Sequence, residues 1–230
     1  YNIICASCKG PLLEHQYQDH LTIVDNDKCL MVVVADGLGS ARHSARGSEL
    51  ICQILSELAN SIDWSVHILP EILNTAMSEW YRRIELKSID SIDCATTCST
   101  VFIDKDSQCA YVCQVGDSPI FYRNDGINVH LIVQEKEFSN ETSCLGTLSH
   151  PKFDIQLVRF EKSFDFLVSS DGFGDEIVPE TADELFDYFI SKYSRIKSAK
   201  RDRTLKIEIL NTIQKKNNDD KSIVFGWICQ

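Results

Sequence analysis

The sequence has no apolar run long enough to cross a membrane, and no apolar secretory signal stands near its start. It also lacks internal repeats, low-complexity tracts and flexible linkers, with only 5 prolines and 10 glycines among 230 residues. These absences argue against membrane-spanning and modular classes of protein. We therefore expect one compact cytoplasmic domain over residues 1–230.

Basic residues are scarce, because 23 Lys and Arg stand against 34 Asp and Glu and the formal net charge is -11. A phosphate backbone or an anionic lipid surface needs a cationic protein surface to neutralise it. The charge balance therefore predicts neither a nucleic-acid partner nor a membrane partner. It is compatible with a site that gathers carboxylates around metal ions.

A second Cys-x-x-C pair is also missing. Cys5 and Cys8 form one such pair, but a zinc ribbon needs two. Several of the 10 cysteines lie inside apolar runs, among them Cys52, Cys98 and Cys113. We expect them to be reduced thiols in the core of a cytosolic protein.

The pattern of apolar residues predicts both strands and helices. Runs that alternate or are apolar throughout predict strands at residues 21–24, 29–35, 96–103, 108–115, 118–123, 128–133, 153–160, 164–169 and 222–229. Helical spacing predicts helices at residues 44–60, 65–86, 181–192 and 203–215. Long helix pairs beside antiparallel strands indicate an α+β fold, with two packed sheets and the helices outside.

Aspartates stand at the ends of the predicted strands. The five are Asp19, Asp36, Asp117, Asp171 and Asp219. Hard cations such as Mg²⁺ and Mn²⁺ take oxygen ligands, so carboxylates that converge at one edge of a sheet sandwich predict a metal site. Any one Asp-Gly pair alone is better explained as a turn. Five acids beside apolar strands favour the metal site.

In their order and neighbours, these segments resemble the protein phosphatase 2C family. The resemblance extends from about Gln18 to Val224 and rests on five motifs, which are residues 34–40 (VADGLGS), 96–101 (TTCSTV), 115–118 (VGDS), 169–173 (SSDGF) and 219–224 (DDKSIV). It implies a four-layer α-β-β-α sandwich with two antiparallel sheets flanked by helix pairs.

The same resemblance implies two bound Mn²⁺ or Mg²⁺ ions, and a third, weaker one in bacterial members. It assigns cation contacts to Asp19, Asp36, Gly37, Asp117, Asp171 and Asp219. Asp36 would bridge the two main ions, and Asp36, Asp171 and Asp219 would form the catalytic set. The implied activity is hydrolysis of phosphoserine or phosphothreonine in proteins by a metal-activated water. The implied partners are a phosphorylated protein substrate and the Ser/Thr kinase that phosphorylates it.

Some family positions differ here. Leu38 stands where many animal members have histidine, which is similar to bacterial members, and no arginine precedes Asp19 to hold the phosphate. Lys9, His15 and His43 are the candidates for that contact, with a solvated surface position as the alternative. A polar segment at residues 134–151 is expected to form a flap beside the site.

Two alternative functions stay open at this level. One is a phosphatase-like regulatory domain with weak or no activity, which the missing arginine favours. The other is a hydrolase of small phosphate monoesters.

Overall fold

Two five-stranded sheets form the centre of the molecule. The computed structural model describes residues 1–11, 16–61, 69–132, 143–147 and 151–228. The first sheet has the strand order β1-β10-β9-β6-β7, and the second has the order β2-β3-β4-β5-β8. Neighbouring strands are antiparallel in both sheets. The strands are β1 (Asn2–Cys8), β2 (His20–Asp25), β3 (Cys29–Ala35), β4 (Cys98–Asp104), β5 (Cys109–Val115), β6 (Ile120–Asn124), β7 (His130–Ile132), β8 (Asp154–Arg159), β9 (Phe164–Ser169) and β10 (Lys221–Trp227).

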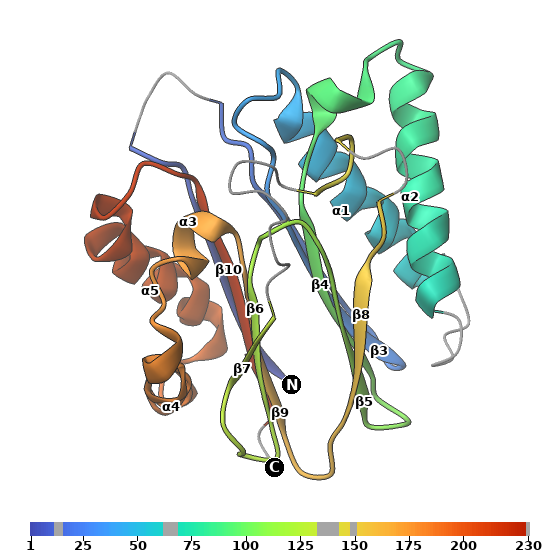
Figure 1. Ribbon diagram of the computed structural model, residues 1–230. Helices are drawn as coiled ribbons and strands as arrows, with labels where there is room; N and C mark the ends of the chain where they lie inside the picture. Colours follow the sequence, from blue (N-terminus) through green and yellow to red (C-terminus); the bar gives the residue numbers. More distant parts are fainter. Residues whose placement is uncertain (12–15, 62–68, 133–142, 148–150, 229–230) are drawn as a thin grey trace.

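Helices cover the outer face of each sheet (Figure 1). Helices α1 (Ser44–Ser61) and α2 (Leu69–Glu85) lie on the second sheet, and α4 (Ala182–Ser194) and α5 (Ser198–Asn211) lie on the first. The short elements are α3 (Asp171–Gly174) and the 3₁₀ turns η2 (Ser91–Cys94), η3 (Pro179–Thr181) and η4 (Ile213–Lys215). The predicted α+β class, with a four-layer α-β-β-α arrangement, is confirmed.

Three apolar layers hold these elements together. In β3, Met31 and Val33 pack toward α1 and α2, while Leu30 and Val32 pack toward the other sheet. The prediction of a strand at residues 29–35 is therefore confirmed, and the strand is buried on both faces. On the far side, Phe225 of β10 packs against the helices over the first sheet.

The first strand of the chain was not predicted. We expected the strands to begin at residue 21, but β1 (Asn2–Cys8) precedes that position and pairs with β10. Its buried residues alternate, yet Ala6 and Cys8 are too small to give a strong apolar signal. Helix α5 also begins five residues before the predicted residue 203 and ends at Asn211.

The cysteines behave as core residues. Nine of them are free thiols within the described part of the chain, and eight of these nine are buried. The lone Cys-x-x-C pair lies in β1, where Cys8 packs under the outer helices. No described helix combines the length and the apolar content that a membrane crossing requires.

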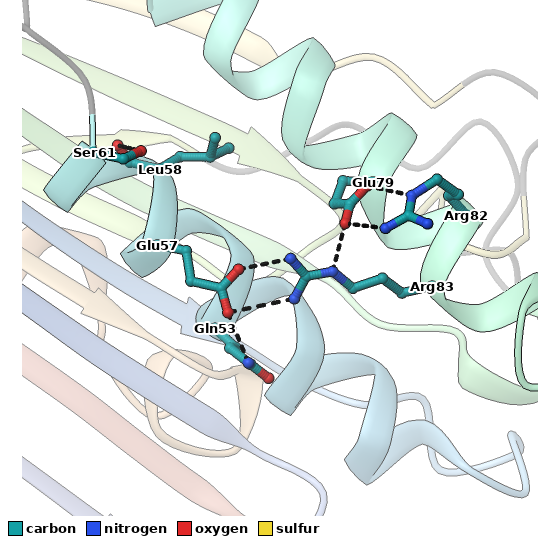
Figure 2. Close-up of polar contacts among 7 residues, drawn as sticks. All are labelled: Gln53, Glu57, Leu58, Ser61, Glu79, Arg82 and Arg83. Atoms are coloured by element: carbon teal, nitrogen blue, oxygen red, sulfur yellow. Dashed lines mark hydrogen bonds and ion pairs between the residues drawn. The ribbon is translucent and has the colours of Figure 1, made fainter.

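A charged network joins the two helices over the second sheet (Figure 2). Arg83 of α2 contacts Glu57 of α1 at 2.6 Å and Glu79 of its own helix at 2.6 Å. Because these side chains remain in contact with solvent, at 25–47% exposure, we expect Arg83→Met to lower the unfolding midpoint by no more than about 2 °C. Calorimetry in 1 M NaCl should abolish the difference, since salt screens exposed charges. A shift that persists in salt would indicate packing as the cause.

Candidate metal centre and active site

The loops that carry the predicted acids meet at one end of both sheets. In the second sheet, His20 at the start of β2 pairs with Ala35 at the end of β3, so Asp19 and Asp36 are neighbours. In the first sheet, Ser169 at the end of β9 pairs with Ile223 near the start of β10, which brings Asp171 close to Asp219. Asp117 lies in the turn between β5 and β6 and so belongs to the same end.

These loops enclose an open cavity of about 380 Å³. Four of the five predicted acids line it, and the fifth, Asp19, is buried beneath it with 1% of its surface exposed. The lining residues are Gly10, Gln18, Asp36, Gly37, Leu38, Gly39, Thr97, Asp117, Asp171, Asn218, Asp219 and Asp220. The structure thus brings together all five acids, although their individual roles stay predictions.

Asp19 forms no ion pair with the described residues, although Lys221 is near enough for its charge to interact with that of Asp19. Neither carboxylate oxygen receives a hydrogen bond from the described residues. Burial raises the pKa of Asp19 to about 7, and the charge of Asp220 contributes to the same shift. An isolated buried carboxylate is unfavourable, so this side chain lacks a partner that a cation would provide.

Asp36 lies between two other acids. Burial raises its pKa well above the ordinary range, and the charges of Asp19 and Asp171 raise it further. Burial also raises the pKa of Asp171, with a further contribution from Asp117 and Asp219. The carboxylates therefore destabilise one another as anions, and a divalent cation between them would relieve that repulsion.

The donor set fits a hard divalent cation. The groups available are carboxylates and the carbonyl of Gly37, which are the oxygen ligands that Mg²⁺ and Mn²⁺ prefer. As the side chains stand, no three His, Cys, Asp or Glu residues within the described ranges surround one common ion position. The fit therefore rests on residue type, on the gathering of the acids and on the unpartnered Asp19.

Threonines hold the Asp36 loop. The backbone N–H of Asp36 donates to Thr97 Oγ1 at 3.0 Å, and Thr96 Oγ1 donates to the Asp36 carbonyl at 2.9 Å. Thr97 in turn lies 2.7 Å from the hydroxyl of Ser118, in the loop of Asp117. The segment TTCSTV thus joins two acid-bearing loops through neutral hydrogen bonds.

Asp220 is a cavity residue to which no role had been assigned. Its carboxylate accepts the backbone N–H of Gly10 at 2.8 Å and that of Gln18 at 2.6 Å. These two bonds occupy both carboxylate oxygens of Asp220, although Asp219 and Asp220 both line the cavity. The adjacent Asp-Asp pair was the available signal, but the sequence does not show which acid is used for structure.

Gly172 allows the loops of Asp171 and Asp219 to approach. A Cβ atom there would lie 2.1 Å from the Asp220 carbonyl oxygen and 2.9 Å from Asp219 Cβ. The Asp220 backbone cannot shift far enough to remove this overlap without strain. We therefore expect Gly172→Ala to lower the unfolding free energy by about 1–3 kcal/mol in urea titrations. Gly39→Ala is the matched control for stability, since its nearest atom would be 3.9 Å away. Equal stability losses for both variants would contradict the close-approach argument.

The candidates for phosphate contact are less well placed. Neither Lys9 nor His43 is among the residues that line the cavity, and His15 lies outside the described residues. Most of the predicted flap at residues 134–151 also lies outside them. Its described part, residues 143–147, is fixed to the site, because Leu145 and Thr96 exchange backbone hydrogen bonds of 3.0 Å.

Comparison with known proteins places this geometry in a family. A sequence model described as protein phosphatase 2C matches residues 14–209. No curated protein matches the chain significantly.

Solved structures share the fold at low sequence identity. The S. agalactiae serine/threonine phosphatase is 17% identical, with a TM-score of 0.75 and coverage of 100% of this chain and 99% of that one. Stp1 from Staphylococcus aureus, a serine/threonine phosphatase, is 14% identical, with a TM-score of 0.75 and coverage of 99% of this chain and 95% of that one. RsbX in complex with magnesium is 15% identical, with a TM-score of 0.67 and coverage of 99% and 94%. Since the matched model spans most of its length, the chain belongs to the protein phosphatase 2C family.

Proposed function

We propose that the protein removes phosphate from phosphoserine and phosphothreonine residues of other proteins, and that it requires divalent cations to do so. One observation carries the proposal: Asp19, Asp36 and Asp171 form a mutually repelling carboxylate group beside an open cavity, and no described residue donates a hydrogen bond to Asp19. Membership of the family supports the reaction class, and relatives named as serine/threonine phosphatases support the substrate class.

The proposed cation ligands are the residues that the motifs predict. They are Asp19, Asp36, the carbonyl of Gly37, Asp117, Asp171 and Asp219, and the cations are two Mn²⁺ or Mg²⁺ with a third held more weakly. When bound, such ions lower the pKa of a water molecule and neutralise the charge of a phosphate group. Asp36 is the central residue, because the charges of both Asp19 and Asp171 act on its carboxylate.

The acid cluster also requires that cations bind before the substrate does. Phosphate monoesters are anionic, and the described lining of the cavity contains acidic side chains but no Lys, Arg or His. An anionic substrate is repelled from this cavity until its charge has been neutralised. Substrate binding, and not only turnover, should therefore depend on the cations.

Leu38 cannot act as a general acid. This side chain lines the cavity at the position where many animal members have histidine, and it cannot donate a proton to the departing serine or threonine oxygen. The protein's part is to orient the substrate through the Asp36 loop, which Thr96 and Thr97 hold at its backbone. The substrate would be a second protein that a serine/threonine kinase has phosphorylated.

The deciding experiment measures phosphate release from a phosphothreonine peptide at several Mn²⁺ concentrations, with EDTA as the metal-free arm. A phosphotyrosine peptide of the same sequence and a nucleotide test the substrate class. We expect release from the phosphothreonine peptide only with Mn²⁺, and much slower release from the other two compounds. Mn²⁺ binding in calorimetry without any release would contradict the catalytic proposal and favour a regulatory domain.

A further inference from the structure

Lys221 is a fully buried lysine beside the acid cluster. It is the first residue of β10, its exposed surface is 0%, and it follows Asp219 and Asp220 directly. Lysine is almost never buried to this degree without a partner. Its side chain lies on the same side of β10 as Ile223, which faces the outer helices and not the other sheet.

Three oxygen atoms surround the Lys221 ammonium group. Nζ donates to the Asn217 side-chain oxygen at 2.6 Å, to the Asp219 carbonyl at 2.7 Å and to the Asn217 carbonyl at 3.3 Å. An ammonium group has three hydrogens, so all of its donors are used. The acceptors are neutral and belong to the loop that carries Asp219, so Lys221 bonds to the backbone of this loop and not to the Asp219 carboxylate.

Asn217 continues the contact to the second loop. Its Nδ2 donates to the Gly172 carbonyl at 2.9 Å and to Glu176 Oε1 at 2.9 Å, while its Oδ1 also accepts the Asp219 N–H at 3.2 Å. Gly172 follows Asp171 directly and lies in α3. Lys221, Asn217 and Gly172 therefore form one hydrogen-bonded series from the loop of Asp219 to the loop of Asp171.

We propose that Lys221 and Asn217 are positioning residues that fix the spacing between Asp171 and Asp219, so that this half of the site is assembled before any cation binds. We call the two residues the Lys221–Asn217 bracket. The inference rests on the proposed function for the use of that spacing. The mutual repulsion of the acids gives the physical reason, because without the bracket the two loops would move apart in the metal-free protein.

Removal of the lysine has two opposite effects on cation binding. Loss of a buried positive charge near the acids would by itself strengthen Mn²⁺ binding, because like charges repel. Loss of the bracket would weaken it, because the ligands would no longer be held at their spacing. The sign of the change in affinity therefore distinguishes a positioning residue from a mere counter-charge.

The test uses Lys221→Met, Asn217→Ala and the double variant. Asn217→Ala keeps the positive charge of Lys221 and removes only the bracket. It therefore provides the test on its own if the lysine variant does not fold. We expect amide exchange at Gly174 and Asp175 in the metal-free protein to accelerate at least about tenfold in each single variant. In calorimetry, the Mn²⁺ dissociation constant should rise about tenfold for both, and the double variant should be no worse than either, because both act through one series.

Lys192→Met is the matched control. Lys192 in α4 also bonds two oxygens, those of Tyr188 and Glu208, but it lies in the outer helix layer. We expect it to alter the unfolding temperature without changing Mn²⁺ affinity or amide exchange in α3. A loss of affinity in this control would show that any destabilisation weakens binding.

Several outcomes would overturn the bracket. Unchanged exchange in α3 would show that the loops are held by other contacts, and unchanged or tighter Mn²⁺ binding in Asn217→Ala would remove the positioning role. Failure of the proposed function is separately visible: the unsubstituted protein would then bind no Mn²⁺ or release no phosphate. In that case, the amide exchange rates in α3 of each variant, compared with those of the unsubstituted protein, still decide whether the bracket exists.

Discussion

Asp36→Asn is expected to lower kcat/KM for a phosphothreonine peptide by at least about a thousandfold at saturating Mn²⁺, which corresponds to about 4 kcal/mol. The substitution keeps the shape of the side chain and removes the charge that lies between Asp19 and Asp171. Because an amide is a poorer ligand for a hard cation than a carboxylate, calorimetry should also show weakened Mn²⁺ binding.

The same substitution should make the metal-free protein more stable. Asp36 is held in a buried position where burial and two neighbouring charges raise its pKa. Its removal eliminates unfavourable interactions that exist only in the folded state, so the unfolding temperature in EDTA should increase. A gain of stability together with a loss of activity would identify Asp36 as a residue kept for function.

Asp104→Asn is the control for charge alone. Asp104 ends β4 at the end of the strand opposite Thr97, and its carboxylate accepts the N–H of Asp106 at 2.9 Å in a surface turn. We expect normal turnover from this variant. Normal turnover from Asp36→Asn as well would refute the assignment of the site.

The second large effect concerns the buried ion pair between Arg123 of β6 and Asp165 of β9. Arg123 Nε and Nη2 donate to Asp165 Oδ2 at 3.2 and 3.1 Å, and the guanidinium carbon lies 5.5 Å from the centre of the Phe186 ring. Asp165 is 4% exposed. Arg123→Met should lower the unfolding free energy by about 3–5 kcal/mol, because it leaves a buried carboxylate without its partner. Urea titration followed by tryptophan fluorescence measures this loss.

The pH dependence of that variant has a definite sign. Burial already raises the pKa of Asp165 even though Arg123 lowers it, so removal of the arginine should raise the pKa further. A carboxyl group with a higher pKa in the folded state binds its proton more tightly there, and stability falls as pH rises through that pKa. The deficit of Arg123→Met should thus be smaller at pH 5 than at pH 8.

A double variant completes the test. Asp165→Asn in the Arg123→Met background removes the charge that the single variant leaves unpaired, and it should recover part of the lost stability. A deficit that is independent of pH and is not reduced by Asp165→Asn would indicate lost packing against Phe186 as the main cause.

The sequence predicted the sandwich and the location of the acids because both follow from local patterns. Strands such as residues 164–169 are strongly apolar, and acids directly after or before such strands must lie at an end of a sheet. The spacing between strands also matched a known family. These features need no knowledge of which strands are neighbours.

Long-range contacts could not be predicted in this way. Strand β1 is stabilised by pairing with β10, which follows it by more than 200 residues. Likewise, nothing near Lys221 indicates that its side chain is buried, and Asp220 is distinguished from Asp219 only by its bonds to Gly10 and Gln18. The short helix α3 was also missed, since four residues are too few to show a helical period.

The position of β10 has a consequence for biosynthesis. The second sheet, β2-β3-β4-β5-β8, contains no residue beyond Arg159, so a growing chain can complete it early. The first sheet cannot close until residues 221–227 have left the ribosome, because β10 inserts between β1 and β9. Asp219 joins the other acids only at that moment. A nascent chain should therefore acquire its complete acid cluster in a single late step, after most of its fold has formed.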